Sequence, residues 1–337
     1  MVEGPLSYTM VGNYTTSAWA FRTMFKNSDD LFNDFIAARN TVAASLARLN
    51  PDPYNDILVQ DTMNGEWFPA GYGANQQTVL LTAFLSTYLG KDPASQSFSP
   101  FLKFPMPNWN ISYNGLGKID FFKKWFTNIS IQHKYSGAYT IGNFYTDAAI
   151  SAILDGYDYG TETVVNGNGD YISPVSMDGV VITEQFQPLI MLSVNMVNSF
   201  QFKLGIQKSR TLNLSFSNNQ LTETYRDGVT FGTGYRIKDL EFNVKTGGTT
   251  HNFKSDLVLQ ADLTYNNNLT QIRKINQMSR QISSGSKIWV ARISAEYALS
   301  STLTLRAFFE TNINTPYIST AYPNSTTKGG ITVRFSF

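Results

Sequence analysis

The clearest pattern in the sequence is an alternation of apolar and polar residues that starts near Asn108 and continues to the end of the chain. Successive side chains of a β-strand point to opposite sides, so a period of two residues predicts strands with one apolar and one polar side. The alternation is plainest in residues 256–265, 288–299, 303–310 and 331–337. We predict roughly twelve to fourteen strands of about ten residues, the length that a tilted strand needs to cross a bilayer.

Charged and amide side chains of the later strands all fall on the polar side of this alternation. In a membrane barrel the apolar side contacts lipid and the polar side lines the lumen, because Arg or Lys on the lipid side costs about 2–4 kcal/mol near the bilayer midplane. We therefore predict as lumen-facing Asp256, Gln260, Asp262, Arg292, Glu296, Arg306, Glu310 and Arg334. The same reasoning places the apolar side of the last strand in lipid, with Ile331, Val333, Phe335 and Phe337.

Residues 1–106 follow a different pattern. Asp29 and Asp30 precede apolar residues spaced three to four apart, and Pro51 follows them, which predicts a helix between these points. A second helix is predicted over residues 76–89, ending at Gly90. We expect residues 1–106 to form a loop-rich, helical insertion or cap with a candidate first strand, and residues 107–337 to form a barrel wall.

Soluble sheets also alternate, so the membrane interpretation depends on further features. The predicted strands are long and numerous, and short turns at Asn198 with Ser199 and at Lys208 with Ser209 connect them. Aromatic residues near the predicted strand ends are typical of an interfacial girdle; they are Trp109, Tyr113, Tyr235, Tyr265 and Tyr297. The expected fold class is all-β, an antiparallel transmembrane β-barrel segment.

Composition agrees with this fold and excludes some site types. Charged residues make up 15% of the 337, below the roughly 25% of soluble domains, and aromatic residues make up 14%. The chain has no cysteine, which excludes disulfides and cysteine-based zinc sites within it. A formal charge of +1 gives no reason to expect a nucleic-acid partner.

The chain contains no run of about 18 apolar residues, so it predicts no transmembrane helix. Its first ten residues lack the basic and apolar regions of a signal peptide. Strands in lipid must close into a barrel to satisfy their backbone hydrogen bonds, so either this chain closes on itself or other strands complete the barrel.

Several stretches resemble the C-terminal part of the SprA family, called Sov in some species, which forms the outer-membrane translocon of the type 9 secretion system of Bacteroidota. They are residues 4–10, 90–93, 107–109, 182–190, 208–224, 232–238, 254–275 and 314–337. The last strand, ending in Phe337, also resembles the C-terminal signal that barrel-assembly machinery reads.

The resemblance implies a single-chain barrel of about 36 strands in the bacterial outer membrane. Such a barrel conducts secreted cargo proteins, serves motility in gliding species, and associates with a PorV-type shuttle protein or a plug protein. This chain would supply a third or less of that wall.

Candidate chemistry is sparse. His133 and His251 are the only histidines and have no obvious convergent partners, so we expect no metal or catalytic role for them. Residues 155–162 and 166–170 resemble oxygen-rich calcium loops, but their spacing fails the EF-hand pattern, which favours surface loops. We predict no catalytic residues, no metal and no cofactor.

The sequence thus predicts a non-enzymatic, protein-conducting component of the outer membrane. Two alternatives stay open: a self-closing porin or TonB-dependent-type transporter for small solutes, and a soluble β-rich adhesin.

Overall fold

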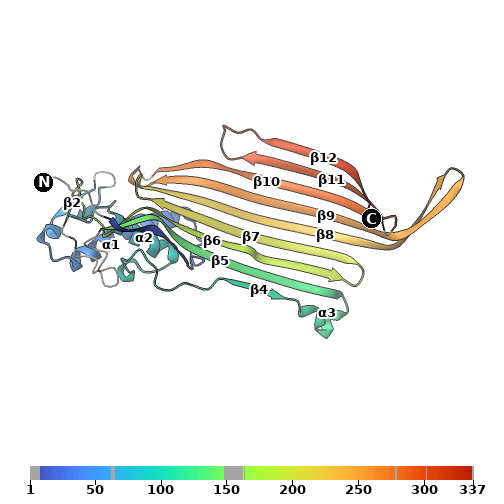
Figure 1. Cartoon of the computed structure of the whole chain (residues 1–337), viewed down its shortest axis with the longest axis horizontal. Coiled ribbons are helices and arrows are strands. Elements are labelled where there is room, and N and C mark those ends of the chain that lie inside the picture. Colours follow the sequence, from blue (N-terminus) through green and yellow to red (C-terminus); the bar gives the residue numbers. More distant parts are fainter. Residues whose placement is uncertain are drawn as a thin grey trace.

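The computed structural model describes residues 8–61, 65–147, 162, 164–277, 279–300 and 302–335. Its main element is a ten-stranded antiparallel sheet, with the two long helices at one end of the strands (Figure 1). The strands are β1 (Tyr8–Ser17), β4 (Trp109–Tyr113), β5 (Phe126–Asp147), β6 (Val175–Met196), β7 (Phe200–Ser215), β8 (Gln220–Thr246), β9 (Thr249–Lys274), β10 (Ser279–Ala298), β11 (Leu303–Pro316) and β12 (Asn324–Phe335).

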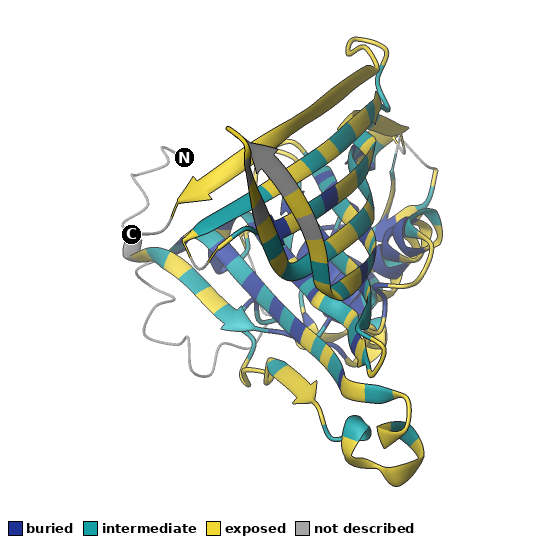
Figure 2. Ribbon diagram, turned by 90° about the vertical axis from the view of Figure 1, so that its right-hand side faces the viewer, coloured by how far each residue is buried: buried dark blue, intermediate teal, exposed yellow. Residues whose placement is uncertain are grey.

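Strands β5 to β12 form a meander in which each pairs with the next along the chain. β1 and β4 both pair with the free edge of β5, β1 with its second half and β4 with residues 131–135. β12 forms the opposite edge, and β12 is exposed along its whole length (Figure 2). The described strands therefore form an open sheet, and they do not close on themselves into a barrel.

The strands are fewer and longer than predicted. The sheet has ten strands, and β8 alone spans 27 residues. The turn expected at Lys208 and Ser209 was wrong, because β7 continues through both residues and Lys208 lies opposite Phe186 and Asp227. Polar residues do not interrupt a strand whose backbone is paired on both sides. The turn at Asn198 and Ser199 is confirmed, with Ser199 at a φ of 69°.

Both predicted helices are present. α1 (Ser28–Leu49) begins where the Asn27 side chain accepts a hydrogen bond from the Asp29 backbone, and α2 (Gln77–Leu89) ends at Gly90, which has the left-handed φ of 68° that favours glycine. Among the described residues, no helix combines the length and apolar character needed to cross a membrane. The remaining elements are short: η1 (Pro53–Asp56), β2 (Leu58–Gln60), β3 (Trp67–Pro69), η2 (Pro93–Ser95), η3 (Leu116–Lys118), α3 (Asp120–Lys123) and η4 (Ile275–Gln277).

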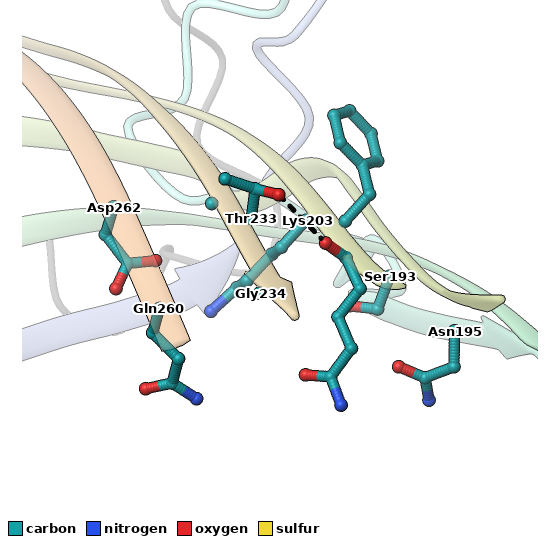
Figure 3. A pocket seen from close by; sticks show the side chains of 10 residues that line it. Ser193, Asn195, Lys203, Thr233, Gly234, Gln260 and Asp262 are labelled. Atoms are coloured by element: carbon teal, nitrogen blue, oxygen red, sulfur yellow. Dashed lines mark hydrogen bonds between the residues drawn. The ribbon is translucent and has the colours of Figure 1, made fainter. Parts of the chain in front are cut away.

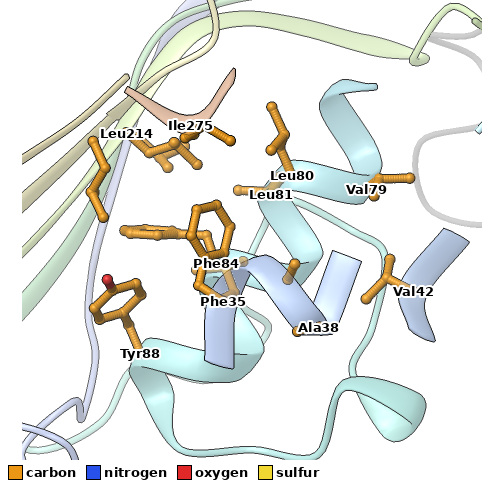
Figure 4. Close-up of a cluster of buried hydrophobic side chains, with 14 of the residues drawn as sticks. Phe35, Ala38, Val42, Val79, Leu80, Leu81, Phe84, Tyr88, Leu214 and Ile275 are labelled. Atoms are coloured by element: carbon orange, nitrogen blue, oxygen red, sulfur yellow. The ribbon is translucent and has the colours of Figure 1, made fainter. Parts of the chain in front are cut away.

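The two long helices form a cap, which we define as the described part of residues 18–107 together with residues 164–174. Its core contains the aromatic rings of Phe35 and Phe84, both fully buried (Figure 4). The same cluster of buried side chains includes Leu212 and Leu214 of β7 and Ile182 of β6. The cap is therefore fixed to the sheet by a shared hydrophobic core.

The sheet has two faces, and the cap covers part of one. Residues directly opposite on paired strands point to the same face. Leu212 and Leu214 of β7 pack in the cap core, so the strand registers identify the side that faces the cap on every strand from β6 to β12. We call this side the cap face and the other the open face. On β7 the cap face continues beyond the cap through Leu204 and Phe202.

The register of the outermost strand pair can be tested by cross-linking. Thr311 and Thr327 lie directly opposite, with their hydroxyl oxygens 3.1 Å apart, and the chain has no other cysteine to compete. We expect the double variant Thr311→Cys, Thr327→Cys to form a disulfide under mild oxidation, seen as a mobility shift that a reductant reverses. The control pair Thr311→Cys, Ser325→Cys is two residues out of register and should cross-link far less; equal cross-linking would contradict the pairing.

Candidate functional site

Beyond the cap along the strands, the cap face carries a broad exposed apolar surface. We call it the apolar band, and its most exposed members are Ile190, Val229, Phe231, Tyr235, Leu259, Leu263, Trp289, Ile293, Phe309, Ile313, Ile331, Val333 and Phe335. Within β6 to β12, every large apolar side chain described as exposed lies on this face. No second layer of the described structure covers the band.

The apolar band has a definite width along the strands. On its cap side it ends at a row of opposed polar residues, Lys208, Asp227, Asn267 and Lys287. On the other side it ends near the turn between β6 and β7 and the start of β11. Roughly ten residues at 3.3 Å each give a length of roughly 33 Å along the strands; a strand tilt of about 45°, as in outer-membrane barrels, would turn this length into a height of roughly 23 Å.

The eight residues predicted to line a lumen all lie on the open face. Arg292 is directly opposite both Asp262 and Glu310, and Glu296 is opposite Arg306. Asp256 and Gln260 lie on the same side of β9 as Asp262, and Arg334 of β12 lies opposite Thr304 of β11. The shared face follows from the registers, whereas its exposure to a lumen stays a prediction.

Charges on the open face pair across strands. Glu310 accepts from Arg292 Nη2 at 2.6 Å and from Lys328 Nζ at 3.0 Å, which joins β10, β11 and β12. Arg236 and Asp256 form a looser pair at 3.7 Å between β8 and β9. These groups are partly hydrated, so each pair contributes little to stability. Their main effect is to keep both signs of charge close together along a wet surface.

A shallow hollow of about 400 Å³ lies between β6 and β9, bordered by Ser193, Asn195, Gln260 and Asp262 (Figure 3). It exists because Gly232 and Gly234 on β8 have no side chains to fill it. The Asp262 carboxylate leans across Gly232, so that a Cβ there would lie 2.5 Å from Oδ1. The hollow is open and mostly polar, and it has no enclosed apolar pocket of the kind that binds small molecules.

Ile331, Val333 and Phe335 of the last strand share the cap face and are exposed, as their alternation predicted. Phe337 lies outside the described residues. The role of this strand in assembly stays a prediction.

A buried ion pair joins the cap to the sheet. Glu184 of β6 contacts Arg210 of β7, and both side chains are almost fully buried. Arg210 also donates to the carbonyl oxygens of Thr23 at 3.2 Å and Ala20 at 3.3 Å, in the turn before α1. Tyr135 donates to the second oxygen of Glu184 at 3.3 Å. A buried charge needs such partners, since its desolvation costs several kcal/mol.

A second charged group lies beside the first, at the start of α1. Arg273 of β9 donates to Glu223 of β8 at 2.9 Å and also contacts Asp29, and Arg280 of β10 lies 3.2 Å from Asp29. Tyr88 of α2 donates to Glu223 at 3.3 Å. The hydrogen bond from Arg273 holds the pKa of the Asp29 carboxyl below its usual value, against the opposing effect of partial burial.

Sequence reasoning missed this junction. Arg210 has the same parity as Leu212 and Leu214, and Glu223 the same parity as Leu221, so these charges stand on the apolar side of their strands. A charged residue in line with apolar ones is a signal for a buried pair. The partners could not be found from the sequence, because Arg210 and Ala20 are 190 residues apart.

The remaining candidates have structural contacts. His133 stacks on Trp109, and its Nδ1 lies 2.6 Å from the Leu189 carbonyl oxygen. The side chain of His251 and most of residues 155–162 lie outside the described part. In the loop at residues 166–170, Asp170 accepts a hydrogen bond from the Gly73 backbone at 2.9 Å, which ties the loop to the cap. Among the described residues, no group of three His, Cys, Asp or Glu side chains could hold a metal ion.

Comparison with known proteins adds no relationship. No protein-family model matches this chain, and a search of curated proteins finds no similar one.

Loss of Arg210 should be far more damaging than loss of an exposed arginine. Arg210→Ala leaves Glu184 buried without its partner, which we expect to cost about 3–5 kcal/mol and to release the cap. The control Arg292→Ala breaks a half-exposed pair and should cost far less. Thermal unfolding and trypsin cleavage at Arg22 and Lys26 measure both effects; equal losses in the two variants would contradict the buried junction.

The Asp29 contact should make cap stability depend on pH. Because the pKa of Asp29 is lowered in the folded protein, its contribution is complete at neutral pH and is lost as the pH falls from the ordinary carboxylate value through the folded one. Asp29→Asn should lower the melting temperature at pH 7 and reduce the difference between pH 7 and pH 3. The matched control is Asp30→Asn, at the neighbouring exposed position; a pH response in the Asp29 variant equal to that of the unchanged chain would refute the linkage.

Proposed function

We propose that this chain is a sector of the wall of an outer-membrane β-barrel, with its apolar band in lipid and its open face toward a water-filled, protein-conducting lumen. The observation that carries the proposal is the separation of the two faces. One side of a single sheet carries exposed aliphatic and aromatic side chains, and the other carries ion pairs and amides. A soluble sandwich would bury the apolar side against a second sheet.

The extent of the apolar band supports lipid as its neighbour. It runs across seven strands, from Ile190 on β6 to Phe335 on β12. Soluble monomers rarely expose contiguous apolar patches larger than a few hundred Å². With the strand tilt of outer-membrane barrels its height would be roughly 23 Å, close to the lipid-facing band of roughly 25 Å in those barrels.

The open edges support a sector and not a complete small pore. Every residue of β12 is exposed, and an unpaired edge in lipid would leave backbone groups without hydrogen-bond partners. We infer that further strands continue the sheet beyond β12 and beyond β1 with β4. This disfavours the self-closing porin among the alternatives.

Transport of protein is the function that a wall of this kind serves best. The described residues show no element covering the open face, and its charges are paired laterally. A hydrated surface with both signs of charge close together offers a passing protein little to bind. We therefore propose a type 9 translocon wall, non-enzymatic, as the resemblance of the sequence implies, with cargo, a PorV-type shuttle protein and a plug protein as its partners.

The membrane assignment can be tested by placing one charge on either face. Ile293→Arg puts a guanidinium in the apolar band, where we expect a cost of about 2–4 kcal/mol and reduced insertion into the outer membrane. Gln260→Arg puts the same group on the open face and should insert normally. Heat-modifiable mobility of the membrane fraction measures insertion; normal insertion of both variants would refute lipid contact at Ile293.

The transport assignment needs a separate measurement. Deletion of the gene containing this chain should abolish release of type 9 cargo into the medium, while the amounts of other outer-membrane barrels stay constant. Normal cargo release from the deletion strain would refute the transport function and leave the membrane assignment intact.

A further inference from the structure

The part of the cap nearest the apolar band lies at the border of that band. In the turn before α1, the ring of Phe25 lies 5.9 Å from the ring of Phe186, and Lys208 Nζ lies 5.8 Å from the Phe25 centroid. Phe186 and Lys208 are opposed residues of β6 and β7 on the cap face, and the next opposed pair along these strands, Ile190 and Ile206, belongs to the apolar surface. Phe25 is nevertheless 61% exposed.

Other aromatic side chains of the cap lie at the same border of the apolar band. Trp19 and Phe21 pack edge-to-face with Trp109 at the start of β4, with ring centroids 6.1 and 5.8 Å from that of Trp109. Trp19 Nε1 donates to the Pro107 carbonyl at 2.8 Å. Tyr135 packs against Phe186 and completes this aromatic cluster. Aromatic rings with a polar group at one end concentrate where hydrocarbon meets water.

Basic residues follow the same border. Lys208 is paired with Asp227 at 2.6 Å, and Lys287 extends over the ring of Tyr317 at 5.4 Å. Long basic side chains beside an apolar surface keep their stems in the apolar layer and their charges among phosphate groups. The border therefore combines aromatic rings and ammonium groups, as the headgroup layer of a bilayer requires.

We propose that the underside of the cap, formed by Trp19, Phe21 and Phe25, is immersed in the headgroup layer of the surrounding bilayer. The cap then stands over lipid on the outer side of the wall and not over the lumen. The inference rests on the proposed function, because it takes the apolar band to be in lipid. Its own evidence is that the cap core and the apolar band share one face of the sheet.

The geometry excludes a cap that covers the lumen while the apolar band is in lipid. The cap covers Arg210, Leu212 and Leu214 of β7. These residues are separated by even numbers of positions from Phe202 and Leu204 on the band side of β7, so all five side chains lie on the same face. The register between β7 and β8 has no bulge that would exchange the two faces. A cap seated on this side of the strands lies on the lipid side of the wall.

Spin labels at three positions of similar exposure test the placement. Phe25, Ile293 and Leu58 are 61%, 58% and 58% exposed, and they lie at the cap underside, in the apolar band and on β2 of the cap. The chain has no cysteine, so once any cysteine elsewhere in the complete protein is replaced by serine, Phe25→Cys, Ile293→Cys and Leu58→Cys each carry one nitroxide. The complete protein is reconstituted in vesicles of phosphatidylethanolamine and phosphatidylglycerol, and relaxation by oxygen and by a water-soluble nickel complex is measured.

We expect the Phe25 label at the depth of the lipid phosphates, the Ile293 label in hydrocarbon and the Leu58 label in water. A Phe25 label as accessible to nickel as the Leu58 label, or shielded from both reagents by protein, would overturn the cap placement while Ile293 still reports lipid. An Ile293 label in water would instead refute the proposed function. If Phe25→Cys does not fold, Lys208→Cys carries the label at the same border from the sheet side.

Discussion

An antiparallel sheet with apolar residues along one face must keep that face away from water, and this constraint organises the whole molecule. The cap covers the face at one end of the strands, through a core shared by Phe35, Phe84 and Leu214. Below the cap the same face continues without any protein covering among the described residues. Burial is worth roughly 25 cal/mol per Å², so an uncovered band across seven strands demands an apolar partner, and lipid is the one proposed here.

The junction between cap and sheet shows how charge is accommodated on an apolar face. Glu184 with Arg210, and Glu223 with Arg273, are buried as pairs; Arg210 also donates to two backbone carbonyl oxygens of the cap, and Tyr88 donates to Glu223. Pairs of this kind add little net stability compared with apolar side chains, but they allow only one arrangement of partners. They therefore specify where the turn before α1 meets the sheet, and thereby hold Phe25 at the border of the apolar band.

The open edges impose a second condition. β12 presents unpaired backbone along its full length, and β1 with β4 forms a similar edge on the other side. Such edges invite pairing with other strands. In the proposed barrel the neighbouring parts of the wall satisfy them. The lateral ion pairs of Glu310 with Arg292 and Lys328 then form part of a continuous hydrated lining.

The sequence by itself determined the features that depend on local geometry. The two-residue alternation assigned all eight polar residues to one side of their strands, because successive side chains of any strand point to opposite sides, and the registers place them on one face of the sheet. That this face lines a lumen stays a prediction. The helix signals at Asp29 with Asp30 and at Gly90 act within a few residues, so both helices were predicted closely. The first strand was anticipated as a candidate, and β1 is that strand.

Only the tertiary structure decided the features that depend on distant contacts. Lys208 and Ser209 look like a turn in the sequence, but pairing with β6 and β8 on both sides keeps them in one strand. The cap could have covered either face, and the choice follows from contacts such as Arg210 with Ala20, between residues 190 positions apart. No local pattern encodes such a contact, because its free energy comes from desolvating both partners together when the chain folds.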